Sequence, residues 1–294
     1  MKKKLLTAAA TAAAAAASAA AYLYAEQNII DPTHRRVYSD IDTPLRMLCL
    51  SDLHGKQFGK NGELLIRKAE SMAPDLIVFP GDTLSADLHN LTPTLDLLKK
   101  LSHFAPCFLI PGNHEKRSGQ WDDLKMLLEQ HGVTVLQNSR WDGVINGVPV
   151  HILGLDEGIA VSKLDYLRAA VGTLEYPMNE QLLEQLCESD GAKIVLSHFP
   201  ECFEKGGYCR FKFDLMISGH AHGGHFRLNE KVGVLAPGQG LFPKFCQGLY
   251  GSRPRLLVCR GLGNDSILPR VNNRPEMALI TLERDRRHLI EMPK

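Results

Sequence analysis

The stretch Pro111-Gly112-Asn113-His114-Glu115 decides how the rest of the chain is interpreted. It follows the apolar run 107–110, Cys-Phe-Leu-Ile, which has the length and composition of a buried strand. The Pro-Gly pair turns the chain, so that the polar triplet emerges where the strand ends. In open α/β sheets, ligands bind at the carboxyl ends of the strands. An isolated pentad of this kind is usually only a polar turn, so its meaning depends on the other strand ends.

Two apolar runs upstream of the pentad also end in polar side chains. Residues 46–50 lead into Asp52 and His54, and residues 76–79 lead into Asp82. On an extended backbone, Asp52 and His54 point to the same face, where they would form half of a metal site. The alternative is a capping carboxylate beside a surface imidazole.

Helical spacing separates these strands and predicts the fold class. Apolar side chains recur at helical intervals over residues 61–72, over 91–103, and from 118 or 119 to 130. Successive strand–helix units predict an α/β domain with a mostly parallel sheet. We expect the strand ends to converge, so that their polar residues surround one site.

The second half of the chain adds imidazoles in equivalent positions. The runs 193–196 and 215–217 end in Ser197-His198 and in the turn Gly219-His220-Ala221-His222-Gly223-Gly224. His220 and His222 alternate, so one turn presents two imidazoles. A hairpin turn is indicated at Asn146-Gly147, and further strands are expected over 133–136, 148–155, 256–258 and 277–282.

Five strand ends therefore present side chains that bind metals or transfer protons. These are Asp52, His54, Asp82, Asn113, His114, His198, His220 and His222. Nitrogen and oxygen donors without a thiolate suit Mn, Fe, Zn or Co. So many donors favour two ions that share a carboxylate over a single ion. Such a pair holds a bridging water, lowers its pKa and clamps a phosphoryl group.

The bulk composition excludes several other classes of protein. The 44% hydrophobic and 23% charged content is ordinary for a globular domain. Lys and Arg number 34 against 33 Asp and Glu, so no basic excess indicates a nucleic-acid partner. The seven cysteines form no CxxC pair, which argues against a disulfide framework or a zinc–cysteine site. Cys202 and Cys209 are close enough in sequence to pair, but free thiols are favoured.

Residues 1–25 differ from the rest of the chain. Three lysines precede an uncharged, alanine-dominated stretch that is long enough to span a bilayer. The alternatives are a signal anchor, a cleaved signal peptide and a soluble helix. Leu23 stands where a cleavage site prefers a small residue, so an anchor through residues 5–25 is favoured. The positive-inside rule then places the main domain outside, although Arg35 and Arg36 weaken that inference. Residues 26–45 are expected to be a linker or an irregular edge, and residues 46–294 one domain.

The ordered motifs D-x-H, G-D, G-N-H-[DE], a lone H and G-H-x-H resemble the signature of the calcineurin-like metallophosphoesterases. The resemblance covers residues 46–225. It implies their fold, a four-layer α/β/β/α sandwich of two mixed sheets flanked by helices. It also implies an enzyme that hydrolyses phosphodiester or pyrophosphate bonds with a metal-bridging hydroxide.

The resemblance assigns a role to each motif residue. Asp52, His54 and His222 would bind one divalent ion, and Asn113, His198 and His220 the other, with Asp82 bridging. His114 would not be a ligand, but would donate a proton to the leaving oxygen. The ions would be drawn from Mn, Fe, Zn, Mg and Co. The alternative is a catalytically silent metal-binding scaffold of the same fold, which tends to lose one or more of these residues.

Within the family, the chain resembles the membrane-associated YaeI/YkuE-type branch. The resemblance rests on the N-terminal span, the Gly-His-Ala-His-Gly-Gly turn and the tail motifs 260–263 and 272–276. It implies a bacterial inner-membrane protein and a phosphorylated small-molecule or lipid substrate, such as UDP-2,3-diacylglucosamine of lipid A biosynthesis. That nucleotide lipid is made in the cytosol, which conflicts with an outward-facing domain.

Two departures from the branch and two arginines complete the candidate residues. Ala221 stands where the branch often has Thr, and His225 where it often has Gln. Surface decoration is favoured for His225 over an additional polar contact. Arg270 and Arg274 are candidate contacts for a phosphate or a lipid head group, although surface arginines are common.

Overall fold

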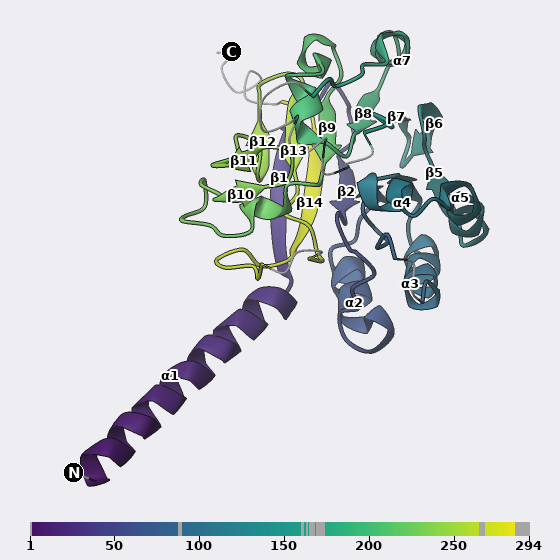
Figure 1. The fold of residues 1–294 in the computed structure, drawn as a ribbon. Helices are drawn as coiled ribbons and strands as arrows, with labels where there is room; N and C mark the ends of the chain where they lie inside the picture. Colours follow the sequence, from purple (N-terminus) through teal and green to yellow (C-terminus); the bar gives the residue numbers. More distant parts are fainter. Residues whose placement is uncertain are drawn as a thin grey trace, which may run out of the picture.

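The computed structural model describes residues 2–87, 90–159, 162, 164, 168, 174–264 and 268–285. Two six-stranded sheets form the centre of the molecule (Figure 1). Sheet A has the strand order β1-β14-β2-β3-β4-β5, and sheet B has the order β12-β13-β9-β8-β7-β6. The pairs β14–β2, β12–β13 and β6–β7 are antiparallel and the other neighbours are parallel, so both sheets are mixed.

Sheet A combines strands from the first half of the chain with one strand from its end. They are β1 (Asp31–Tyr38), β14 (Glu276–Glu283), β2 (Leu45–Cys49), β3 (Leu76–Pro80), β4 (Cys107–Ile110) and β5 (Val133–Val135). Sheet B consists of β12 (Gly248–Tyr250), β13 (Arg255–Val258), β9 (Leu215–Ser218), β8 (Ala192–Leu196), β7 (Val148–Gly154) and β6 (Ser139–Ile145). A short separate hairpin is formed by β10 (Leu235–Ala236) and β11 (Gly240–Leu241).

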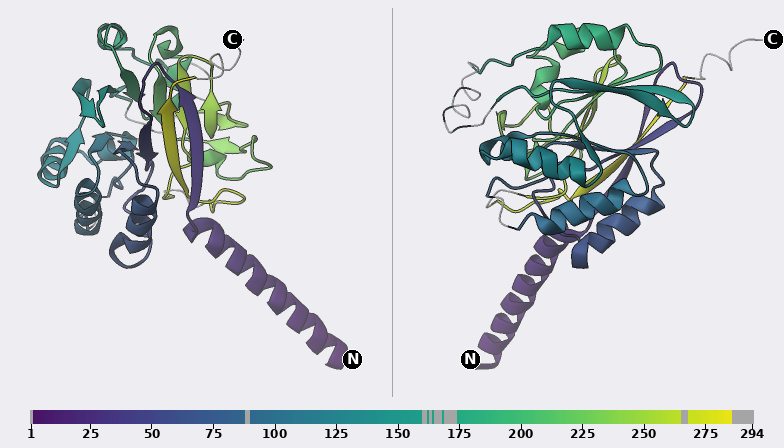
Figure 2. Two further views of the ribbon diagram at one scale, coloured as in Figure 1. Left: turned by 180° about the vertical axis from the view of Figure 1, so that it is seen from behind. Right: turned by 90° about the vertical axis from the view of Figure 1, so that its right-hand side faces the viewer.

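Helices cover the outer face of each sheet (Figure 2, right). Sheet A is covered by α2 (Glu63–Ser71), α3 (Thr92–Ser102) and α5 (Trp121–Gln130). Sheet B is covered by α7 (Glu180–Cys187) and by the 3₁₀ turns η2 (Pro200–Phe203) and η3 (Tyr208–Arg210). The remaining short elements are α4 (Asn113–Arg117), η1 (Lys60–Gly62) and η4 (His222–Gly224). The α/β/β/α sandwich implied by the motifs is therefore confirmed.

The apolar strands owe their continuous hydrophobicity to burial on both faces. In β3, Leu76 and Val78 pack between the two sheets, whereas Ile77 and Phe79 pack under the helices. A strand covered on both sides has no solvent face that would require polar residues. This explains why the predicted strands read as unbroken apolar runs. The strands expected at 107–110, 193–196 and 215–217 are confirmed within one residue at each end.

Of the two alternatives for residues 26–45, the linker is wrong and the edge is what the structure shows, although as a regular strand. These residues contain β1, which pairs in parallel with β14 from Asp31 opposite Glu276 to Tyr38 opposite Glu283. The strand forms the edge of sheet A, with one face largely exposed and the other mostly half-buried, so its sequence is largely polar. Its partner lies more than 240 residues away, and a local pattern gives no sign of such a pairing. The domain thus begins before residue 46.

The helix α1 (Lys2–Asn28) projects from the domain (Figure 1). Its segment Leu6–Asn28 is long and apolar enough to cross a membrane, judged by length and composition alone. The last two turns contact the domain: Tyr22 Oη donates to Asn272 Oδ1 at 2.8 Å, and Gln27 Nε2 donates to the carbonyl oxygen of Arg270 at 2.9 Å. The helix therefore emerges from a fixed point on the domain surface.

Candidate metal centre

The candidate ligands lie at the carboxyl ends of strands from both sheets. Asp52 and His54 follow β2, and Asp82 follows β3 in sheet A. From sheet B, His198 follows β8, and the pair His220 and His222 follows β9. The two sheets face each other, so the loops after their parallel strands meet at one end of the sandwich. The expected convergence of the strand ends is what the structure shows.

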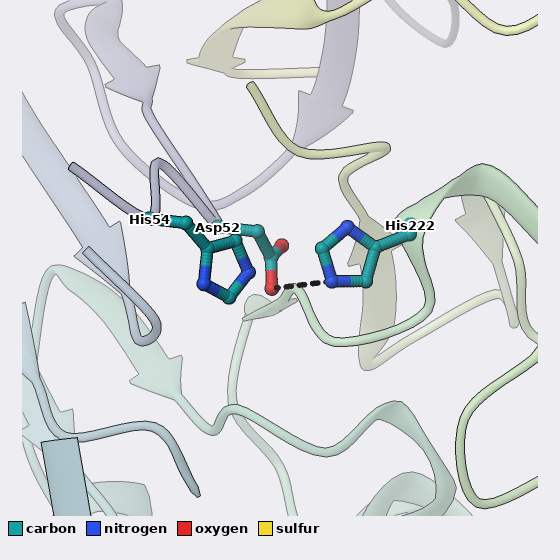
Figure 3. A group of neighbouring side chains, drawn as sticks. All are labelled: Asp52, His54 and His222. Atoms are coloured by element: carbon teal, nitrogen blue, oxygen red, sulfur yellow. Dashed lines mark ion pairs between the residues drawn. The ribbon is translucent and has the colours of Figure 1, made fainter. Parts of the chain in front are cut away.

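We call Asp52, His54 and His222 the first cluster. One potential ligand atom from each lies within 4.8 Å of the others. Figure 3 shows the carboxylate of Asp52 beside both imidazoles, with Oδ1 3.9 Å from Nε2 of His222. The rings of His54 and His222 are stacked, with centroids 5.2 Å apart. The main-chain N–H of His220 donates to Asp52 Oδ1 at 2.9 Å and fixes the carboxylate between the sheets.

We call Asp82, His198 and His220 the second cluster. Their ligand atoms also lie within 4.8 Å of one another. Nε2 of His198 is 3.2 Å from Asp82 Oδ2 and 3.2 Å from Asn113 Oδ1, so the amide lies beside this cluster. Asp82 also belongs to a third such group with His54 and His114, and it thereby connects the two clusters.

The backbone at these strand ends is not extended. Asp52 and His54 have φ values of 48° and 49°, and His220 and His222 have 64° and 47°. The prediction that these pairs share a face by alternation along a strand is therefore wrong in its reason. Each of these residues has a left-handed backbone conformation, which sets the direction of its side chain. Such a conformation costs roughly 1–3 kcal/mol and is concentrated at functional sites.

Glycines allow the strand ends to approach one another closely. A Cβ on Gly219 would lie 1.9 Å from Ser51 Oγ and 2.5 Å from Asp52 Oδ2. A Cβ on Gly112 would lie 2.2 Å from Asp82 Oδ1. Real side chains do not tolerate such distances, so these two positions require glycine. The G-N-H and G-H-x-H motifs thus have a steric explanation in this structure.

Glu115 organises the loops after β3 and β4, a role that the sequence analysis missed. Its buried carboxylate accepts the main-chain N–H groups of Asp82 at 3.0 Å, Leu84 at 2.9 Å and Gly112 at 2.9 Å. Burial and the nearby charge of Asp82 raise the pKa of Glu115 to about 7. The sequence contained a sign of this role, because Glu115 is the acidic residue at the end of the pentad and the family motif also has an acid at that position.

The buried charges of the second cluster stabilise each other. Burial opposes charge on both Asp82 and His198, but their mutual attraction prevails. The pKa of Asp82 consequently lies well below its ordinary value, and the pKa of His198 rises to about 10. The His198 ring is oriented by a 2.7 Å contact between its Nδ1 and the carbonyl oxygen of Pro80.

The first cluster is electrostatically different. Burial lowers the pKa of His54 to about 3 and the pKa of His222 well below its ordinary value, so both rings are neutral near pH 7. Burial raises the pKa of Asp52 to about 6, although the charge of His198 opposes this shift. Neutral imidazoles with lone pairs beside a carboxylate are in the form that binds divalent ions.

The buried ring nitrogens of His54 are suited to binding a metal ion. Within the described part of the chain, neither ring nitrogen of His54 has a hydrogen-bond partner. A buried polar atom without a partner costs stability, so such atoms call for an explanation such as an ion. The donor set consists of imidazole nitrogens and carboxylate and amide oxygens, which suits divalent first-row metals. The residues therefore fit the divalent metals used by the family.

His114 lies in α4, directly after the strand end. Its main-chain N–H donates to Asp82 Oδ1 at 2.8 Å, and its ring packs edge-on against His54 with centroids 4.6 Å apart. Arg117 Nη2 contacts Nε2 of the ring. Because a guanidinium only donates, Nε2 is the acceptor in this contact. No sequence pattern marks Arg117, which lies one helical turn beyond His114.

His225 is not surface decoration, and that prediction is wrong. Only 5% of its surface is exposed, and its ring stacks on His222 with centroids 5.4 Å apart. The η4 turn brings the chain back onto the first cluster, which explains the burial of His225.

The two candidate arginines lie in different surroundings. Arg270 is fully buried and donates to the carbonyl oxygen of Gly263, and its Nη2 lies 3.5 Å from Nδ1 of His222. Arg274 instead pairs with Glu26 of α1 at 3.0 Å.

Comparison with known proteins agrees with this geometry. The family model for the calcineurin-like phosphoesterases matches residues 45–224. The chain is 27% identical to the phosphodiesterase YaeI of Escherichia coli, over 83% of this chain and 84% of YaeI. It is 27% identical to the metallophosphoesterase YkuE of Bacillus subtilis, over 88% of each chain, and 25% identical to YkoQ of the same organism, over 79% of this chain and 82% of YkoQ. The chain belongs to the calcineurin-like phosphoesterase family and is a hydrolase that acts on phosphoester bonds.

Proposed function

We propose that the chain is a two-metal phosphoesterase that hydrolyses phosphodiester or pyrophosphate bonds. The observation that carries this proposal is the pair of clusters joined through Asp82. A single metal site would not require two sets of buried donors that share one carboxylate. Asp52, His54 and His222 would hold one ion, Asn113, His198 and His220 would hold the other, and Asp82 would be the ligand that the two sites share.

The protein and the ions divide the chemical work. Two divalent ions, when bound, lower the pKa of water and balance the charge of the phosphoryl group. The protein fixes the donors rigidly through left-handed strand ends and buried hydrogen bonds, so little reorganisation is needed during the reaction. Glu115 holds the loops after β3 and β4 together and thereby keeps Asp82 in place.

His114 supplies the proton that the departing oxygen requires. Its ring touches His54, so it borders the first cluster without belonging to it. Arg117 contacts Nε2 and orients the ring, so that Nδ1 faces away from Arg117; the imidazolium form would donate its Nδ1 proton to the leaving oxygen and become a neutral imidazole. The positive charge of Arg117 also favours release of that proton.

The test uses the full-length protein, stripped of metal and reloaded with Mn, Mg or Zn. It is assayed on a soluble phosphodiester, a phosphomonoester and a nucleotide-lipid pyrophosphate. We expect turnover of at least one substrate that depends on metal and disappears in Asp82→Asn. Two bound ions without turnover of any substrate class would instead support a catalytically silent scaffold.

The same proposal includes a membrane anchor and a lipid-linked substrate. Support comes from the position of α1, whose Glu26 accepts the main-chain N–H of Asn273 at 2.7 Å. The side chain of Asn273 in turn donates to the carbonyl oxygen of His222 at 2.7 Å. The end of the candidate anchor is thus connected to the first cluster through one residue. A substrate held in the bilayer would reach a site so placed.

Exposed apolar side chains near the η4 turn also support this part of the proposal. Leu228, Leu241 and Phe242 are 67%, 69% and 63% exposed and lie in the segments that follow η4. Apolar side chains on loop tips suit contact with lipid. UDP-2,3-diacylglucosamine in the bacterial inner membrane is the specific candidate. That substrate requires a domain that faces the cytosol, whereas the charge rule places the domain outside. Topology reporters fused after residue 285 test that orientation, and a cytosolic reporter signal would reverse it.

A further inference from the structure

Glu201, in the η2 turn three residues after His198, is a buried acid that the proposed mechanism does not use. Its side chain is only 2% exposed, and within the described residues neither carboxylate oxygen has a hydrogen-bond partner. Gln239 lies nearby, but its amide oxygen and one hydrogen of its amide nitrogen are already bonded to the main chain of Phe245. An acceptor-only group in this position requires a donor.

A second buried atom without a partner among the described residues, Nε2 of His220, lies close to the same space, beside Gly238. A Cβ on Gly238 would be 3.5 Å from Glu201 Oε1 and 3.6 Å from His220 Nε2. Apart from the glycine and its chain neighbours, no other heavy atom of the described residues lies within 4 Å of that point. One water molecule at this position is within reach of both atoms. The missing side chain of Gly238, whose φ is +72°, keeps the space open.

The His220 ring is otherwise held by packing. Phe199 and His198 contact it edge-on, with ring centroids 4.6 Å and 5.0 Å away. Edge contacts of this kind fix the plane of the ring but do not choose which nitrogen carries the proton. A metal-binding histidine is usually set in the correct tautomer by a carboxylate or carbonyl that accepts from its other nitrogen.

We propose that Glu201 is the positioning residue for His220. Its carboxylate accepts a hydrogen bond from Nε2–H of His220, directly or through one water beside Gly238. The proton on Nε2 leaves the lone pair of Nδ1 for the second ion. Glu201 is therefore an outer partner of the second cluster and not a ligand. This inference rests on the two-ion site proposed above.

The inference is tested by metal binding, independently of turnover. Metal-free, full-length Glu201→Gln is titrated with Mn²⁺ in detergent by calorimetry, and its metal content is measured after desalting. We expect the affinity for the second ion to fall about 10–100-fold, which is typical for loss of such a partner, with the first ion unaffected. Glu201→Asp keeps the charge but shortens the side chain, so it should recover part of the affinity.

The chain offers a matched control in Glu157. This residue is also buried, and burial raises the pKa of both carboxyls to about 7, but Glu157 accepts from Ser197 Oγ instead of facing His220. Glu157→Gln should bind both ions as the wild type does. In thermal unfolding, Glu201→Gln should keep the metal-free melting temperature, or raise it, and lose part of the metal-induced increase.

Two results would overturn the inference. Wild-type affinity for both ions in Glu201→Gln is the first, and an equal loss in Glu157→Gln is the second. A wild type that binds fewer than two ions contradicts the two-metal function itself, and this inference with it. If Glu201→Gln does not fold, the Glu201→Asp titration decides alone, since an unchanged second-ion affinity there contradicts the positioning role.

Discussion

The first and second clusters contain similar side chains, but different parts of the chain support them. The second cluster is held by nearby segments. Glu115 accepts the main-chain N–H of Asp82, and the carbonyl oxygen of Pro80 orients His198. These supports lie within a few residues of a ligand in sequence, or on the neighbouring strand end.

The first cluster depends on residues close to both ends of the chain. The main-chain N–H of Gly263 donates to the carbonyl oxygen of Asp52, and Asn273 donates to the carbonyl oxygen of His222. Asn273 is itself held by Glu26, which lies almost 250 residues away in sequence. The first cluster is therefore supported by segments from both ends of the chain, whereas the second is supported by segments next to the strand ends.

Asp82→Asn should have the largest effect, because it acts on both clusters. The variant removes the shared charge and leaves the buried, protonated His198 without its partner. Breaking such a pair costs about 3–5 kcal/mol of stability. We expect both ions to be lost and metal-dependent turnover to vanish, as measured by metal analysis and steady-state rates. Far-ultraviolet circular dichroism verifies that the variant is folded.

His54→Ala is the matched comparison, since His54 is proposed as a ligand of the first ion only. It should mainly empty the first site and leave the second ion bound. Equal metal stoichiometry in the two variants would contradict the bridging role of Asp82.

His114→Ala should be next in size, because it removes a proton donor and no ligand. General acid catalysis typically contributes 10²–10⁴-fold, so the rate on a poor leaving group should fall by that order with both ions retained. The loss should shrink for p-nitrophenolate, which departs without a proton. An equal loss on both substrates would make His114 an electrostatic stabiliser of the phosphoryl oxygens.

Much of the second cluster and its strands could be predicted from the sequence. Buried strands such as β3 and β4 read as unbroken apolar runs, and the ligands follow them directly. Glycines and polar residues in a fixed order marked the site, because close approach of the strand ends permits little else. Even the acid of the pentad, Glu115, was visible, although its contacts were not.

The supports of the first cluster could not be predicted in this way. The edge strand β1 is polar, and its pairing with β14 spans most of the chain. The burial of His225 and Arg270 results from loops that fold back onto His222, and no periodicity records that return. The left-handed conformation of Asp52 is likewise a property of the assembled loops, so alternation along a strand was the wrong guide.

The two clusters should respond differently to pH. In the metal-free protein the pKa of His198 is raised to about 10, so this ring is protonated between pH 7 and 9 and must lose its proton when the second ion binds. The affinity for the second ion should therefore rise about tenfold per pH unit in this range. The first cluster is already deprotonated there, and its affinity should fall only below about pH 6, where Asp52 takes up a proton.

Mn²⁺ titrations in buffers of different ionisation enthalpy measure the protons released by each ion. One proton for the second ion and none for the first at pH 8 is the expected result. If binding of the first ion released the proton instead, the protonation states assigned to the two clusters would be wrong.

The smallest effect should come from Glu26, at the end of α1, which supports the first cluster through Asn273. Its buried carboxylate accepts from the main chain of Asn273 and from Arg274, and hydrogen bonds to charged groups contribute about 1.5–3 kcal/mol. Because all ligands remain, Glu26→Ala should lower the affinity for the first ion by no more than about tenfold and leave the affinity for the second ion unchanged.

Three further variants serve as controls. Tyr22→Phe loses only an exposed contact to Asn272 and should match the wild type. Removing residues 1–25 keeps Glu26 and should leave a soluble, active domain, whereas removing residues 1–28 should reproduce the Glu26→Ala defect. Metal titrations of the four variants test this prediction. Weaker binding of the second ion, or unchanged binding of the first, would show that the end of α1 does not support the first cluster.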